Sequence, residues 1–80
     1  MEYFLYKNII VDPAICSGKP VIKGTRITVK TIMEFVIAGD TDKDILENYP
    51  SITAEDLNNC KEFSLLALEK GISSIIPTAA

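Results

Sequence analysis

The chain has no histidine and no tryptophan, and only two of its 80 residues are cysteine. Histidine is the commonest general base in enzymes, so the usual route to acid–base catalysis is missing. Two cysteines without histidine cannot form an ordinary structural zinc site. The sequence also lacks nucleophile-elbow, zinc-protease and phosphate-loop motifs. We therefore expect a protein that is not an enzyme and that holds no metal or other cofactor.

Long apolar runs are missing as well, and no stretch approaches the length of a membrane span. The first residues include Glu2 where a secretion signal would carry bases, and no small-residue cleavage site follows. These features predict a cytoplasmic protein with no membrane partner. In that compartment we expect Cys16 and Cys60 to stay reduced, the first in a turn and the second in a helix core.

Positive charge is scarce but concentrated in one segment. The net charge is −3, with eight Lys and Arg residues against eleven Asp and Glu residues. Residues 13–33 carry four of the bases and no acid, whereas residues 34–80 carry nine acids and three lysines. The chain is thus a basic segment joined to an acidic body. The negative net charge of the whole chain argues against a general nucleic-acid binder.

A chain of this length forms one domain with a small core, and such domains often need a partner or a second copy for stability. We therefore treat residues 1–80 as a single domain and expect a homodimer. Within it we distinguish a β-rich arm and hairpin at 1–27, a three-helix core at 28–71 and an apolar tail at 72–80.

The strand signals lie in the arm. Residues 3–11 are rich in aromatic and β-branched side chains, which predicts one strand, or two short strands broken at Lys7 and Asn8. Gly24 predicts a tight reversal within a hairpin at 21–27, because glycine accepts positive φ. The N-terminal strand can pair either with this hairpin or with the same strand of a second chain, and both arrangements stay open.

Three threonines, each followed by apolar residues at helical spacing, predict three helices capped by Thr28, Thr41 and Thr53. Gly39 and Gly71 are placed to end the first and the third. Acids near the second and third helix starts suit the positive end of the helix dipole, which explains them without a metal site. The predicted fold is mainly α: a short N-terminal strand or hairpin, then a helix-turn-helix core of the homeodomain-like or winged-helix-like kind.

The basic segment supplies candidates for contact with DNA or with a protein partner. These are Lys19, Lys23, Thr25, Arg26, Thr28 and Lys30. The bases would meet phosphate or carboxylate oxygens, and the hydroxyls would donate hydrogen bonds. The alternative is that the lysines only keep the hairpin surface in contact with water and form ion pairs with the acidic body.

In a helix-turn-helix protein the start of the third helix enters the DNA groove. The side chains there that could read bases are Ser51, Thr53, Asn58 and Asn59. Glu55 and Asp56 lie in the same turn and would repel phosphate, which weakens the prediction of direct base readout.

The second half of the third helix is apolar on more than one face. Either it is the central core helix, or its exposed side contacts another chain. The candidates for contact with a partner protein or a second copy are Leu65, Leu66, Ile72, Ile75 and Ile76.

Residues 8–70 closely resemble the family called domain of unknown function 433 (DUF433). The resemblance rests above all on the run Gly18-Lys19-Pro20, on Ile22, and on Gly24-Thr25-Arg26-Ile27. It implies a small prokaryotic protein with a homeodomain-like or winged-helix-like core. Many members look like antitoxins encoded beside a PIN-like ribonuclease toxin. Lys19 and Arg26 belong to this run, and we expect them to contact either DNA phosphate or an acidic toxin surface.

We therefore predict an antitoxin-like binding protein of a type II toxin–antitoxin pair that neutralises a PIN-like ribonuclease toxin, with its own operator DNA as a second candidate partner. The alternative is a stand-alone helix-turn-helix DNA-binding transcriptional regulator. A small metal-dependent enzyme is a weaker third interpretation, because the clustered carboxylates follow the helix starts. The acidic surface could also imitate nucleic acid toward a basic partner.

Overall fold

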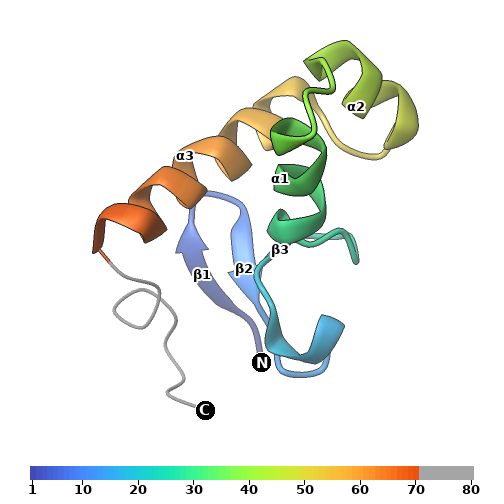
Figure 1. Ribbon diagram of the computed structural model, residues 1–80. Helices are drawn as coiled ribbons and strands as arrows, with labels where there is room; N and C mark the ends of the chain where they lie inside the picture. The colour runs from blue at the N-terminus through green and yellow to red at the C-terminus, as the bar shows by residue number, and fades with distance from the viewer. Residues whose placement is uncertain (71–80) are drawn as a thin grey trace.

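A computed structural model of the chain describes residues 1–70. It shows a small antiparallel sheet followed by three helices, in the order that the sequence predicts (Figure 1). The elements are β1 (Tyr3–Tyr6), β2 (Ile9–Val11), a single 3-10 turn (Cys16–Gly18), β3 (Val21–Ile22), α1 (Val29–Ile37), α2 (Asp42–Asn48) and α3 (Ala54–Lys70). The predicted fold class, a short β-rich start and a three-helix core, is confirmed.

The N-terminal apolar segment forms two strands rather than one. The chain reverses at Lys7, whose φ of 49° lies in the left-handed region, and β1 then pairs antiparallel with β2. β2 in turn pairs with β3 through Ile9–Ile22 and Ile10–Val21, giving the order β1-β2-β3. The arm therefore pairs within its own chain, through β2. The outer side of β1 pairs with no other strand of residues 1–70.

A compact turn joins β3 to α1. The amide of Thr25 donates to the carbonyl of Ile22 at 3.0 Å, and the amide of Ile22 donates to the carbonyl of Ile27 at 3.1 Å. Gly24 sits in this turn at a φ of 82°, which glycine adopts without a steric cost. The predicted hairpin is thus present in minimal form: beyond the turn, Thr28 bridges back to Val21, and the amide of Val29 donates to the carbonyl of Pro20.

Each helix begins after the threonine that the sequence assigns as its cap. The hydroxyl oxygens of Thr28, Thr41 and Thr53 each accept a hydrogen bond from the amide three residues further on. At the start of α3 the side chain of Asp56 also accepts a hydrogen bond from the amide of Thr53, at 2.9 Å. Thr53 and Asp56 therefore form a reciprocal capping box. Gly39, at a φ of 93°, follows the end of α1 as predicted.

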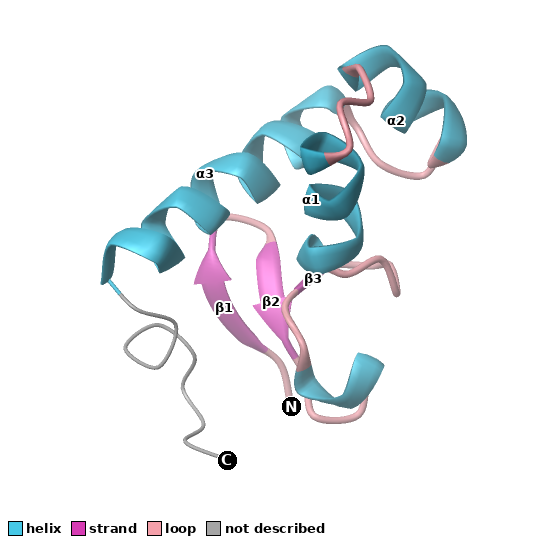
Figure 2. Cartoon of the chain, viewed as in Figure 1, coloured by secondary structure: helices cyan, strands magenta, loops and turns pink. Residues whose placement is uncertain are grey.

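The core lies where α3 crosses the inner face of the sheet and the side of α1 (Figure 2). Its buried members are Ile9, Ile22, Val29, Ile32, Ile45, Ile52, Leu57, Cys60 and Phe63. Leu68, near the end of α3, is 84% exposed, so the C-terminal part of this helix carries a large apolar side chain outside the core. Within residues 1–70, no helix has both the length and the apolar character needed to cross a membrane.

Candidate partner-binding groove

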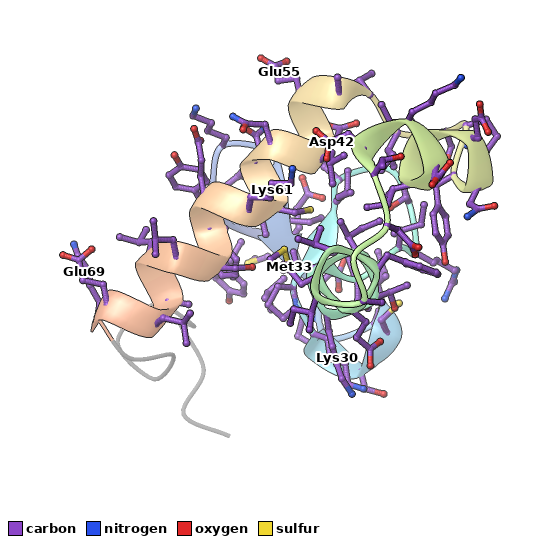
Figure 3. All side chains as sticks on the ribbon, turned by 45° about the horizontal axis from the view of Figure 1, so that its top comes forward. Lys30, Met33, Asp42, Glu55, Lys61 and Glu69 are labelled. Carbon is purple, nitrogen blue, oxygen red and sulfur yellow. The ribbon has the colours of Figure 1, made fainter. Side chains whose placement is uncertain are left out.

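A groove with a volume of about 740 Å³ runs between α1 and the second half of α3. Its lining consists of Lys19, Pro20, Thr28, Val29, Lys30, Met33 and Ile37 on one side and Phe63, Ser64, Ala67 and Leu68 on the other. Figure 3 shows Met33 pointing from α1 toward α3, and Lys30 lies in the first turn of α1. The groove is therefore a surface made by two helices that lie far apart in the sequence.

Large apolar side chains are left in water along this groove. Ile37 on α1 is 82% exposed, and Leu68 on α3 is 84% exposed. The hydroxyl of Ser64 donates to the carbonyl of Cys60 at 2.8 Å, so it is occupied within its own helix. The surface between the two helices is consequently apolar and unlike the charged remainder of the chain.

Among residues 1–70, two lysines and no carboxylate line the groove. Lys19 and Lys30 are both exposed. They come together because the amide of Val29 donates to the carbonyl of Pro20 at 3.0 Å, which fastens the loop carrying Lys19 to the first turn of α1. The groove thus combines an apolar lining with positive charge, a pattern that suits a partner with apolar and acidic side chains.

The other two bases of the segment lie elsewhere. Lys23 and Arg26 line a second depression, of about 410 Å³, together with Thr25 and Glu2. Lys23 forms an ion pair with Glu2, and its ammonium lies 5.3 Å from the centre of the Phe4 ring. The structure therefore divides the four bases into two pairs in two separate depressions.

The candidate threonines of the basic segment serve the fold. The hydroxyl of Thr25 donates to the carbonyl of Ile22 at 2.8 Å and accepts from the amide of Ile27 at 3.0 Å. Thr28 caps α1 and also donates to the hydroxyl of Thr31 at 2.9 Å. Both hydroxyls thus have partners within the chain.

The start of α3 is exposed and acidic. Ser51 is exposed in the turn before it, Thr53 caps it, and Glu55 points into solvent (Figure 3). The side-chain amide of Asn58 donates to Glu62 at 3.1 Å. The interpretation of Asn59 as a base-reading residue was wrong, because it is only 4% exposed.

Asn59 belongs instead to a buried polar network that fastens the β1–β2 turn to α3. Its side-chain amide donates to Oδ1 of Asn8 at 2.9 Å, and the amide of Asn8 donates to Asp56. Oδ1 of Asn59 is buried without a partner in the described part of the chain. No local pattern in the sequence predicts this network, because Asn8 and Asn59 lie 51 positions apart.

A second polar cluster, which the sequence analysis missed, lies beside this network. The hydroxyl of Tyr6 donates to Oε1 of Glu62 at 2.7 Å, and the ammonium of Lys7 lies 3.1 Å from the same oxygen. The hydrogen bonds from Tyr6 and then Lys7 lower the pKa of Glu62, while the bonds to Glu62 raise the pKa values of Tyr6 and Lys7. The cluster ties β1 and its turn to the middle of α3.

Both cysteines are free thiols, in the positions that the sequence predicts. Cys16 is half-buried in the 3-10 turn, and its thiol donates to the carbonyl of Arg26 at 3.3 Å. Cys60 is buried in α3, and desolvation, with the nearby charge of Asp56, raises its pKa to about 12. Across residues 1–70, no three Cys, Asp or Glu side chains are grouped closely enough to hold a metal ion.

The candidate contact residues at the C-terminal end are only partly described. Leu65 is 68% exposed and Leu66 is half-buried, and neither lines the groove. Ile72, Ile75 and Ile76 lie outside the described residues. The exposed leucine of α3 that lines the groove is Leu68.

Comparison with known proteins gives two matches and no assigned activity. Residues 9–64 match the family described as "Protein of unknown function (DUF433)". The chain is also similar to a DUF433 member protein from Anabaena variabilis, whose crystal structure superposes with a TM-score of 0.73 at 35% sequence identity. That alignment covers 85% of this chain and 67% of the other. No curated protein matches the chain.

Proposed function

This chain belongs to the DUF433 family, and we propose that it is an antitoxin-like protein that acts by binding a partner protein rather than by catalysis. The proposed partner is a PIN-like ribonuclease toxin, as the resemblance to antitoxins of this family suggests. The observation that carries the proposal is the groove between α1 and α3, whose described lining is apolar, includes two lysines and contains no carboxylate.

The apolar residues of the groove supply the binding energy in this proposal. Ile37 and Leu68 are each more than four-fifths exposed. Covering one such side chain completely is worth about 2 kcal/mol. A partner helix or strand that buries both would gain about 4 kcal/mol from these two side chains, which offsets part of the cost of association, and covering Met33 would add to it.

The lysines of the groove select an acidic partner. Lys19 and Lys30 stand on the rim of an otherwise apolar surface, so an acidic side chain of the partner would be paired there. PIN-like ribonuclease sites are rich in carboxylates. Insertion of Lys19 near such a site would compete with the metal ions and substrate that the toxin needs, which accounts for neutralisation without a catalytic step.

The test is co-expression with the product of a neighbouring gene that encodes a PIN-like ribonuclease, followed by pull-down, light scattering and a ribonuclease assay. We expect a stable complex and loss of ribonuclease activity. Leu68→Glu should weaken the complex by about a hundredfold, because it removes an apolar contact and buries a charge. Leu65→Glu is the matched control, since Leu65 is an exposed leucine of the same helix that lies outside the groove.

Charge reversal tests the basic rim separately. Lys19→Glu combined with Lys30→Glu should slow association and remove its salt dependence. Lys43→Glu on α2, an exposed lysine outside the groove, should leave both unchanged. A complex that tolerates Leu68→Glu and the double lysine reversal would refute the groove as the binding site.

The stand-alone DNA-binding regulator is the less well supported function. Glu55 is exposed and Asp56 lies in the same first turn of α3, the turn that a helix-turn-helix protein inserts into the groove. Thr53 and Asn58 already have partners within the chain. Binding to the gene's own promoter that weakens steeply with salt, and that Ser51→Ala or Thr53→Ala alters in sequence preference, would support this alternative.

A further inference from the structure

The groove between α1 and α3 lies beside the point where α3 ends. Leu68 lines the groove and precedes Lys70, the last residue of α3, by two positions. Residues 71–80 follow directly, and they lie outside the part of the chain that the structure describes. This segment therefore leaves α3 next to a large apolar side chain of the groove that is 84% exposed.

The composition of residues 71–80 matches the groove. They include three isoleucines, Ile72, Ile75 and Ile76, and no Asp, Glu, Lys or Arg. The described lining of the groove is apolar apart from two hydroxyl side chains and two lysines. A segment without charged side chains loses no charge hydration when it enters such a surface, so burying its isoleucines there is favourable.

The segment is also long enough to cover the groove. α1 has nine residues and is therefore about 13 Å long, and residues along this whole length, from Val29 to Ile37, line the groove. Ten extended residues span up to about 33 Å. Residues 71–80 can consequently turn back at the end of α3 and still reach the C-terminal end of α1.

We infer that residues 71–80 fold back onto the groove between α1 and α3 of the same chain and cover it with their isoleucines. Gly71 supplies the reversal, since a glycine that follows a helix end adopts the left-handed conformation without a steric cost. The residue after such a glycine packs against the last turns of the helix, which places Ile72 against Ala67, a lining residue. The two later isoleucines then cover Ile37 on α1.

The short connection makes a weak contact sufficient. A segment joined to its binding surface by a few residues experiences an effective concentration of about millimolar. An affinity too weak to detect between separate molecules therefore keeps the groove covered in the free protein. The segment offers no Asp or Glu side chain to Lys19 and Lys30, so an acidic partner protein retains an advantage over it.

The covered groove has a regulatory consequence, which rests on the proposed function. A partner that binds the groove must displace the segment, so its apparent affinity falls in proportion to the fraction of molecules whose groove is open. Replacing the three isoleucines with serine should therefore tighten the complex about threefold to tenfold. A weaker complex would contradict this competition. The covering itself is a property of the chain alone and can be measured without a partner.

Thiol–disulfide exchange measures how often the segment meets the groove. The full chain with Cys16→Ser carries Ser74→Cys in the segment and Ile37→Cys in the groove, while Cys60 is buried and does not interfere. Equilibration with glutathione gives the effective concentration of the two thiols. The matched pair is Ser74→Cys with Leu65→Cys, because Leu65 is exposed, lies outside the groove and is nearer along the chain. We expect a value about tenfold higher for the Ile37 pair.

Changes within the segment show whether its isoleucines cause this difference. The combination Ile72→Ser, Ile75→Ser and Ile76→Ser keeps the length of the segment and removes its large apolar side chains. It should remove the difference between the two pairs. Thr78→Ser with Ala79→Ser, the control in the same segment, should preserve it.

The methionine signals give a second readout, since the chain has only two methionines. Met33 lines the groove, and Met1 is not among the lining residues. A spin label on Ser74→Cys, again with Cys16→Ser, should broaden the methyl signal of Met33 in nuclear magnetic resonance spectra. The signal should sharpen when the three isoleucines are replaced with serine.

Three results would overturn the inference. These are equal effective concentrations for the two cysteine pairs, a covalent dimer in place of a bond within one chain, and a Met33 signal that the spin label leaves unchanged. If the segment lies on the groove but the PIN-like partner does not bind there, the proposed function fails and this inference stands. If the partner binds the groove and the segment does not, the proposed function stands and this inference fails.

Discussion

The buried network of Asn8, Asp56 and Asn59 allows a sharp test of how the arm is held to the helices. Asn8→Ala removes the acceptor for the amide of Asn59, a residue that is only 4% exposed. It also removes the donor to Asp56. A buried donor left without a partner costs about 1–3 kcal/mol, which is more than a typical hydrogen bond contributes. The backbone carbonyl of Asn8 still accepts from the amide of Lys23, so the turn itself should survive.

Replacing both asparagines should be milder than replacing Asn8 alone. Asn59→Leu in the Asn8→Ala background removes the unpaired amide together with Oδ1, which already lacks a partner in the described structure. Polar pairs replaced on both sides by apolar groups of similar shape are close to neutral. We therefore expect the double variant to be more stable than Asn8→Ala, although it has lost both native side chains and not one.

Urea denaturation followed by circular dichroism measures both variants. With a slope of about 1 kcal/mol per molar urea for a domain of this size, Asn8→Ala should lower the midpoint by about 1–3 M. Equal midpoints for Asn8→Ala and the native chain would refute the reasoning. A double variant whose loss of stability equals or exceeds the sum of the two single losses would refute it as well.

Three further predictions concern the cysteines, the glutamate cluster and the cap of α3. A thiol reagent should modify Cys16 readily in the native protein and Cys60 only after unfolding, because burial raises the pKa of Cys60 to about 12; fast modification of both would contradict this. Glu62 has a lowered pKa in the folded chain, so its contribution to stability is present above its ordinary pKa of 4.5 and is lost as pH falls below that value. Glu62→Gln should therefore be less stable than the native chain near neutral pH, and thermal unfolding curves should converge in acid. Thr53→Ala should cost about 1 kcal/mol of unfolding free energy by removing the cap, with Thr53→Ser as the control that restores it.

Local signals in the sequence were sufficient to predict where the helices of this fold begin and where the chain turns. Thr28, Thr41 and Thr53 begin the three helices, because a cap needs only an oxygen and an amide three residues away. Gly24 and Gly39 take up the positive φ values that the reversal and the helix end require. Each of these effects acts over a few neighbouring residues, so reading the chain in order was enough to find it.

The candidate site was only partly predictable for the opposite reason. The sequence grouped four bases as one segment, whereas the bond between Val29 and Pro20 brings Lys19 to Lys30, and Lys23 turns toward Glu2. The sequence also singled out Leu65 as a contact residue, while the groove is completed by Leu68. The direction that an exposed side chain takes depends on contacts between distant parts of the chain, which periodicity does not encode.

By itself the sequence determined a β-rich start followed by three helices, the caps of those helices, the turn at Gly24 and the resemblance to the DUF433 family, while it left open whether residues 3–11 form one strand or two. Only the tertiary structure decided that Asn59 is buried against Asn8, that the outer edge of β1 pairs with no strand within residues 1–70, and that α1 and α3 leave an apolar groove between them. The physical reason is the distance along the chain over which each interaction acts. Caps and turns are satisfied by near neighbours, whereas burial and surface shape follow from packing between residues about fifty positions apart in the chain.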